Sequence, residues 1–415
     1  MKVSLLDRYT SIRQRSQNIC APLTVEDQIL QSMEDASPIK WHLAHTTWFF
    51  ETFVLKPFKE GYEPLNDAYS YLFNSYYVQA GARFMRDRRG LISRPSLAQI
   101  WDYRNAIDEA IGELLSAPIG EEVARVMEVG LNHEQQHQEL MVTDVHHLLF
   151  ANPLLPAYHD SVKPVSVQSP SFEWKEFDEG VVRIGHAADS FCYDNEGPIH
   201  RQFLEGFALG NRPVTNGELV AFIEEGGYSN ELLWLSSVWA LKELEGWSHP
   251  LFWIPESSGW SEFSLYGKGP LDPHNPATHI SYYEADAIAR WMGARLPTEF
   301  EWEHASLVAS AGQGHYSDEL NFYPHFRQKD TDASLVHMFG SSWEWTNSHY
   351  SPYPGYKPVE GALGEYNGKF MVNQFVLRGG SCATPSDHIR HTYRNFFPAH
   401  ARWQFSTCRL AKRIV

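Results

Sequence analysis

The chain changes character near residue 150, and this break constrains its fold more than any other feature. Up to that point apolar side chains recur at helical spacing, whereas the next segment, "ANPLLPAYHDSVKPVSVQSPSF", has four prolines and no periodicity. Short segments then alternate with turns rich in Gly, Pro, Asn and Asp. We therefore predict an α + (α+β) protein, a length of 415 residues being enough for two domains. The predicted parts are a helical domain (1–152), a linker (153–172) and a mixed α+β domain (173–415).

Helix-start signals support a bundle of four antiparallel helices in the first domain. Ser37 before Pro38 is typical of a helix N-terminus. Thr24–Asp27 and Ser96–Gln99 resemble capping boxes. The long stretch that includes residues 121–150 keeps its apolar residues at helical spacing, so it predicts one long helix.

The second domain offers fewer helical patterns. We expect helices at 216–225, 282–292 and 299–309. Gly379 and Gly380 in "LRGGS" suit a tight backbone position, and Trp343 and Trp345 in "SSWEWTNS" suit core packing. We therefore interpret these motifs as scaffold.

The bulk composition narrows the class of protein. A net charge of −17 argues against a nucleic-acid or anionic-membrane surface. The four cysteines are scattered without a paired motif, which is typical of a reduced protein. The N-terminus lacks an apolar core of signal-peptide length, and no run approaches about 18 apolar residues. We expect a soluble, cytoplasmic protein with small-molecule substrates, no nucleic-acid partner and no membrane contact, and leave a homo-oligomer open.

The stretch "LNHEQQHQEL" matches the zinc-peptidase signature, with His133 and His137 one helical turn apart and Glu134 between them. Both histidines fall on the apolar stripe of the helix. Glu134 lies about 100° around the helix from His133, so we expect it to face solvent or a further polar partner. On the preceding helix, His45 falls on the corresponding stripe and His42 at its edge.

One histidine of this kind would more often be a hydrogen-bonded core residue than a ligand. Several buried imidazoles facing one another need a shared partner, and a divalent metal is the most economical one. Three histidines without a carboxylate would leave a +2 site with about three free positions, which suits a redox iron that takes an anionic ligand and dioxygen. A zinc peptidase would need a further downstream ligand and Glu134 aimed at a bound water. The residues alone leave iron and zinc open.

Motifs along nearly the whole chain resemble a known family. "HLAHTTWFFE" and "HEQQHQEL" resemble the two metal-binding helices of DinB-like domains. "PVTNGELVAFIEEGGY", "ARLPTEFEWEHA", "SSWEWTNS" and "LRGGSCATP" resemble the formylglycine-generating-enzyme-like fold, which derives from C-type lectins. In this order they resemble the iron-dependent sulfoxide synthases of ergothioneine biosynthesis. The resemblance implies a DinB-like four-helix bundle followed by a formylglycine-generating-enzyme-like domain.

The resemblance also implies an activity. The family is Fe(II)- and O2-dependent and joins a cysteine-type thiol to the imidazole of hercynine (Nα-trimethylhistidine), giving a sulfoxide. Its iron ligands map onto His45, His133 and His137, with His42 as the competing choice. The alternatives are a selenoneine synthase that takes a selenosugar, a zinc hydrolase, and a non-catalytic ligand-binding module.

Substrate contacts follow from the same resemblance. Gln136 matches a glutamine that contacts hercynine, and Asn395 with Phe396 matches the segment that holds the betaine end. An aromatic face suits a quaternary ammonium, which has no N–H to donate. Tyr76 and Tyr77 match tyrosines that line the iron site, where a hydroxyl could supply a proton. The plainer interpretation is a surface glutamine and two bundle aromatics.

Two further stretches of the sequence bear on the identity of the thiol donor. Arg86 or Arg89 could bind the carboxylate of cysteine as a fork, although a solvated loop is the default for such a basic run. One branch of the family has Trp-Asp after "RN" and takes γ-glutamylcysteine; this chain has Phe396 and Phe397 there. It therefore resembles the shorter branch, which takes free cysteine. Cys382 and Cys408 do not match the copper-binding pair of formylglycine-generating enzymes, so we do not expect that activity.

Overall fold

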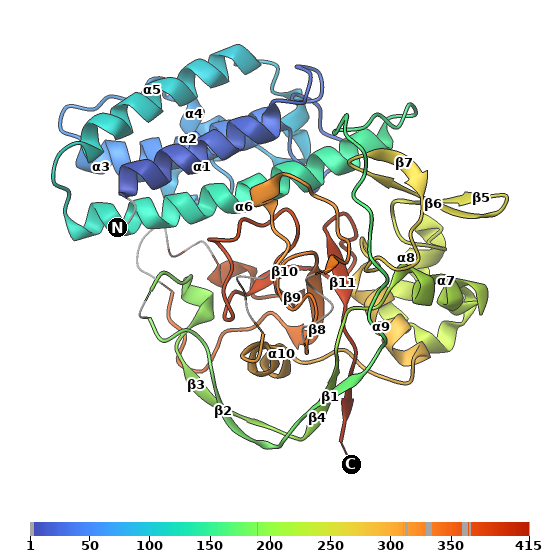
Figure 1. The fold of residues 1–415 in the computed structure, drawn as a ribbon. Helices are drawn as coiled ribbons and strands as arrows, with labels where there is room; N and C mark the ends of the chain where they lie inside the picture. Colours follow the sequence, from blue (N-terminus) through green and yellow to red (C-terminus); the bar gives the residue numbers. More distant parts are fainter. Residues whose placement is uncertain are drawn as a thin grey trace. The chain divides into compact units, whose positions relative to one another are not determined.

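The computed structural model describes residues 4–188, 190–309, 311, 314–328, 334–358, 364 and 367–414. The chain divides into two compact units: the first runs as far as Tyr158, and the second comprises His159–Pro358 and Asn367 onward (Figure 1). Within the described residues, no helix has the length and apolar character needed to cross a membrane.

The first unit is helical, as expected, with four long helices in its described part, although no predicted helix start corresponds to the first of them. They are α1 (Leu5–Cys20), α2 (Ile39–Phe50), α5 (Leu97–Leu115) and α6 (Glu121–Ala151). Helix α2 packs against both α5 and α6, and α1 also contacts α5 and α6. A π-helical turn (Glu51–Leu55) and the short helices α3 (Lys56–Phe58) and α4 (Ala68–Phe73) follow α2, and 3₁₀ helices occupy Val78–Ala80 and Arg86–Leu91. The four long helices thus enclose the core of this unit.

Of the predicted helix starts in this unit, one is confirmed and two differ from the structure. Ser96 and Gln99 form a complete capping box at the start of α5. Helix α2 instead begins one residue later than expected, with Pro38 at the N-cap and no side-chain cap. Thr24 and Asp27 do exchange the hydrogen bonds of a capping box, but they open only a turn. No helix forms between this turn and Pro38.

The second unit is a mixed α+β domain, also as expected. Its largest sheet has the order β10-β9-β8-β11, formed by β8 (Trp343–His349), β9 (Gln374–Arg378), β10 (Asn395–Pro398) and β11 (Ser406–Cys408). A three-stranded sheet joins β1 (Trp174–Phe177), β4 (Phe207–Gly210) and β12 (Ala411–Arg413). Strands β2 (Gly180–Ile184) and β3 (His200–Leu204) form a pair. Strands β5 (Trp253–Glu256), β6 (Gly259–Ser264) and β7 (Gly267–Pro270) form another sheet.

Three of the helices in this unit were predicted. They are α7 (Asn216–Glu224), α9 (Tyr282–Trp291) and α10 (Glu299–Ser306), and each begins with a complete capping box. Helix α8 (Ser236–Glu245) was not predicted, because Leu235 precedes it and no side chain caps it. Gly246 ends α8 in the left-handed conformation, which is the one local signal the sequence offered.

The residues interpreted as scaffold behave as scaffold. Gly379 has a φ of +101°, and a Cβ atom there would lie 2.6 Å from the carbonyl oxygen of Met338, so only glycine fits without a shift. Trp343 and Trp345 are buried, and the indole of Trp345 donates to the carbonyl of Ile280. Residues 153–172 contain no helix or strand.

Candidate metal centre

Three buried histidines of the first unit converge on one point. His45 comes from α2, and His133 and His137 come from α6, one helical turn apart. Each offers a ring nitrogen that lies within 4.8 Å of the others, and Nε2 of His45 is 3.2 Å from Nε2 of His133. The structure therefore brings together the three side chains that the sequence singled out as ligands.

One ring nitrogen of His45 and one of His137 are engaged by groups outside the cluster. Nδ1 of His45 lies 2.5 Å from the carbonyl oxygen of Phe73, which accepts its proton and leaves Nε2 for the cluster. Nδ1 of His137 lies 2.8 Å from Nδ1 of His42. The indole of Trp41 stacks on the His45 ring at a centroid distance of 4.6 Å and holds its plane.

Burial sets the charge state of the cluster. It lowers the pKa of His45 and His137 well below the ordinary value, and the neighbouring histidines lower both further. The pKa of His133 falls to about 3, again chiefly through burial. All three imidazoles are therefore neutral near pH 7, which is the state that binds metals. Three neutral nitrogen donors without a carboxylate in the group fit a divalent cation that keeps open positions.

Glu134 does not face solvent. The side chain is completely buried, and its carboxylate accepts from Arg13 (2.9 Å), from the Ser16 hydroxyl (2.6 Å) and from Arg104. Burial alone would raise the pKa of this carboxyl, but the charges of Arg104 and Arg13 hold it down at about 2. The prediction that Glu134 faces solvent is therefore wrong, and the alternative prediction that it meets a polar partner is confirmed. The sequence could not reveal those partners, because Arg13 and Arg104 lie on α1 and α5.

These contacts bear on the peptidase interpretation of the motif. A zinc peptidase needs a glutamate whose carboxylate is free to take a proton from a bound water. Here both carboxylate oxygens are engaged by arginines in the helix core. The arrangement favours a structural role for Glu134.

His42, the competing ligand, lies behind the cluster. It is buried and contacts His137 with Nδ1, while its Nε2 lies 3.0 Å from Oδ2 of Asp144. Burial lowers the pKa of His42, opposed by the carboxylate of Asp144. Both ring nitrogens of His42 are thus engaged by protein groups. The pairing of His42 with Asp144 was not predicted, because it joins two different helices.

The two candidate tyrosines lie against each other. Their hydroxyl oxygens are 3.3 Å apart and their ring centroids 4.5 Å apart. Tyr77 is fully buried and packs on Trp48 and Phe53, whereas Tyr76 is half-buried. Phe49 contacts both Tyr77 and His133, so one aromatic ring separates Tyr77 from the cluster along this path.

The two candidate arginines differ sharply in environment. Arg86 is exposed and donates to the carbonyl of Asp35. Arg89 is buried and donates to the hydroxyls of Ser37 (2.9 Å) and Ser75 (3.0 Å). Its guanidinium lies 3.3 Å from the ring centroid of Trp41, the same indole that stacks on His45. No described carboxylate forms an ion pair with Arg89, and its Nε has no hydrogen-bond partner.

The remaining candidates are the three residues predicted to contact hercynine. Gln136 is half-buried on α6. In the second unit, Asn395 and Phe396 open strand β10, both half-buried, and the Phe396 ring stacks on Tyr350 at a centroid distance of 4.0 Å.

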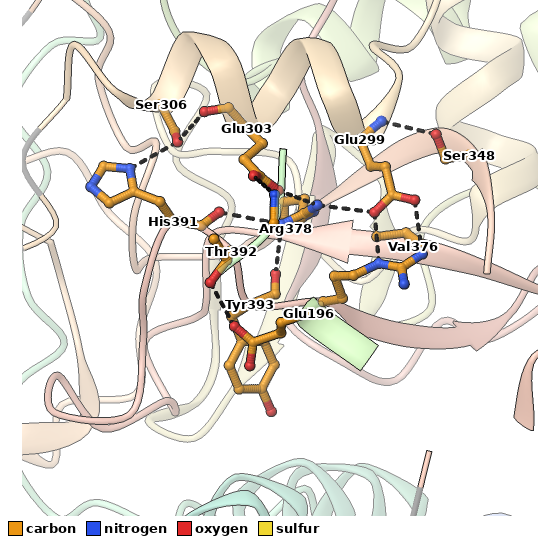
Figure 2. A network of polar contacts seen from close by, with 12 residues as sticks. Glu196, Glu299, Glu303, Ser306, Ser348, Val376, Arg378, His391, Thr392 and Tyr393 are labelled. Atoms are coloured by element: carbon orange, nitrogen blue, oxygen red, sulfur yellow. Dashed lines mark hydrogen bonds and ion pairs between the residues drawn. The ribbon is translucent and has the colours of Figure 1, made fainter. Parts of the chain in front are cut away.

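A buried charge network anchors the start of β10. Arg394 makes two hydrogen bonds to Glu299 (2.8 and 2.9 Å) and one to the carbonyl of Asn195. Figure 2 shows Arg378 between the carboxylates of Glu299 and Glu303, at 2.9 and 2.8 Å. Asn395 thus follows an arginine whose position is tightly defined. This network was not predicted, because its members come from distant segments.

Comparison with known proteins defines the class of the second unit. A family model, the sulfatase-modifying factor enzyme 1-like domain, matches residues 172–331 and 318–414. A formylglycine-generating enzyme of Streptomyces coelicolor is 28% identical and covers 49% of this chain and 76% of its own length. The second unit is therefore a domain of this class.

Longer matches extend over both units. A hercynine oxygenase of Mycobacterium tuberculosis is 30% identical over 90% of this chain and 91% of the relative. A hercynine oxygenase of Mycolicibacterium thermoresistibile is 29% identical over 90% and 87%. The chain belongs to the hercynine oxygenase family and is an enzyme.

Proposed function

We propose that this enzyme uses Fe(II) and O2 to join hercynine to L-cysteine, giving hercynylcysteine sulfoxide in ergothioneine biosynthesis. The observation that carries the proposal is the cluster of three buried, neutral histidines without a carboxylate, in a chain whose relatives are named hercynine oxygenase. A relative from Schizosaccharomyces pombe named ergothioneine biosynthesis protein 1 supports the pathway; it is 26% identical over 54% of this chain and 28% of its own length.

His45, His133 and His137 would hold the iron. Bound there, Fe(II) would supply redox chemistry with dioxygen and open positions for a thiolate. The neutral ligand set leaves the full +2 charge to attract an anionic sulfur. Trp41 and the carbonyl of Phe73 keep the His45 ring oriented for this role.

Arg89 is the better of the two arginine candidates for the cysteine carboxylate. A buried guanidinium without an acidic partner is costly, and a substrate carboxylate would compensate for it. Burial together with the charge of Arg86 lowers the pKa of Arg89 well below its ordinary value, in line with an environment that favours an incoming anion. Arg86, by contrast, is solvated.

Tyr76 and Tyr77 are proposed to act as a pair. The hydroxyl of Tyr76 is placed to donate to that of Tyr77, so a proton given up by Tyr77 could be replaced from the less buried Tyr76. Gln136, Asn395 and Phe396 are proposed to bind hercynine. The Phe396 ring stacks on Tyr350, and an aromatic ring suits the trimethylammonium group.

The test combines metal analysis with product identification. Protein purified without oxygen should carry about one iron per chain, consume O2 only with hercynine and a thiol present, and form hercynylcysteine sulfoxide by mass spectrometry. Parallel reactions with γ-glutamylcysteine and a selenosugar identify the donor. Zinc as the bound metal, or no O2 uptake with hercynine and cysteine, would overturn the proposal.

A further inference from the structure

A chain of hydrogen bonds leads away from the histidine cluster and ends at a carboxylate. Nδ1 of His137 lies 2.8 Å from Nδ1 of His42, and Nε2 of His42 lies 3.0 Å from Oδ2 of Asp144. All three side chains are buried, with His42 on α2 and the other two on α6. The carboxylate therefore contacts a proposed iron ligand through one intervening imidazole.

The chemistry of these groups places the protons along the chain. An ionised carboxylate only accepts, so Nε2 of His42 carries the proton and donates it to Asp144. In a neutral imidazole the other nitrogen is then an acceptor, so Nδ1 of His42 accepts from Nδ1–H of His137. His137 is left with a bare Nε2, whose lone pair is available to a cation.

We propose that Asp144 and His42 are positioning residues that fix the tautomer and ring orientation of His137 for metal binding. The inference rests on the proposed function, since it takes His137 as a ligand. Besides orienting the ring, the carboxylate makes His137 a more basic ligand, as groups hydrogen-bonded to metal-bound histidines do.

A second contact keeps Asp144 in place. The backbone N–H of Ser37 donates to the same Oδ2 atom at 2.8 Å, just before α2 begins. The carboxylate thus also ties the start of α2 to α6. If Asp144 only joined the two helices, its replacement in a folded protein would leave metal affinity unchanged. If it also orients His137, its replacement should weaken metal binding.

The test is Co(II) titration of the metal-free full-length protein, followed by visible absorption. Three variants are compared with the wild type: Asp144→Asn, His42→Phe and the double variant. We expect Co(II) binding to weaken about 10- to 100-fold in His42→Phe and about 10-fold in Asp144→Asn, with shifted Co(II) absorption bands in both. Because Asp144 acts through His42, the double variant should bind no more weakly than His42→Phe alone.

The matched control is His147→Phe, also on α6, whose Nδ1 lies 2.8 Å from the Ser32 hydroxyl. It should leave Co(II) affinity within about twofold of wild type, a change too small to signal a lost ligand contact. Circular dichroism of the metal-free forms checks folding, and Asp144→Asn keeps the test decisive if His42→Phe fails to fold, because its amide oxygen can still accept from Ser37. Unchanged affinity and spectra, or additive losses in the double variant, overturn the positioning role. Wild type that binds neither Co(II) nor Fe(II) overturns the proposed function as well, whereas active wild type with unaffected variants overturns this inference alone.

Discussion

His42 and His45 show how finely the roles of two buried histidines on one helix are divided. His45 has one nitrogen engaged by a backbone carbonyl and the other facing the cluster. His42 has one nitrogen on a carboxylate and the other on His137. The same residue type, one helical turn apart, is thus placed either at the cluster or behind it.

This difference predicts opposite outcomes for iron binding. His45→Ala, His133→Ala and His137→Ala should each lose most bound iron, because each removes one of three donors. His42→Ala should still bind iron when iron is supplied in excess, since only the support of His137 is lost. Iron quantification after anaerobic loading and desalting is the measurement, with circular dichroism as the folding control. Full occupancy in the His133 and His137 variants, or iron loss in His42→Ala with retention in His45→Ala, would refute the assignment.

A second prediction concerns the residues proposed to bind hercynine. Asn395→Ala should raise KM for hercynine and discriminate less against plain histidine, at a cost of about 1–3 kcal/mol for one lost polar contact. Iron content should stay unchanged, because Asn395 belongs to the second unit and the histidines to the first. The same kinetic measurements should be made on Gln136→Ala, whose residue lies on α6. Hercynine kinetics untouched in both variants would show that the betaine binds elsewhere.

Glu134 joins three of the long helices of the first unit. Its carboxylate on α6 meets Ser16 and Arg13 of α1 and Arg104 of α5. The two arginines also donate to threonine hydroxyls of α2, namely Thr47 and Thr46. One glutamate in the signature motif therefore links the helices that carry the metal-binding candidates.

Glu134→Gln should consequently reduce stability more than chemistry. The change would remove the carboxylate partner of buried Arg104 and one of the two carboxylate partners of buried Arg13. It should lower the free energy of unfolding by about 3–5 kcal/mol, measured by urea denaturation. Turnover per bound iron should change only modestly. A collapse of sulfoxide formation with iron still bound would give Glu134 a chemical role.

The difference in stability between the wild type and Glu134→Gln should depend on pH. The pKa of Glu134 is about 2 in the folded protein, below the value near 4.3 of an unfolded chain. A group with a lowered folded pKa stabilises above its unfolded pKa, and that contribution is lost as the pH falls through the folded pKa. The stability difference between wild type and Glu134→Gln should therefore shrink by about 3 kcal/mol between about pH 5 and pH 2. A difference that stays constant over this range would contradict the lowered pKa.

For the whole molecule, binding of the proposed metal would be coupled to folding. A metal that binds only the folded chain stabilises it by about 3–4 kcal/mol when present at about 100 to 1,000 times its dissociation constant. Fe(II) added without oxygen should therefore raise the melting temperature of the wild type, and a chelator should reverse the rise. His45→Ala serves as the control and should show no iron-dependent shift. An equal shift in both proteins would point to iron bound outside the histidine cluster.

Local patterns determined a good part of this protein. The break near residue 150, the capping box of α5 and the inward faces of His45, His133 and His137 follow from spacing along single elements. Such features depend on neighbours within a few residues, which the sequence displays directly. The family motifs added the expected activity, because their order along the chain is specific.

Tertiary structure alone decided which charges meet. That Glu134 is buried between Arg13 and Arg104, that Arg89 is buried with no acidic partner among the described residues, and that His42 joins Asp144 to His137 depend on contacts between distant segments. Helical periodicity states which face a residue occupies, but not which side chain of another helix reaches it. A buried charge is tolerated only with the right partner, and that partner is chosen by packing in three dimensions.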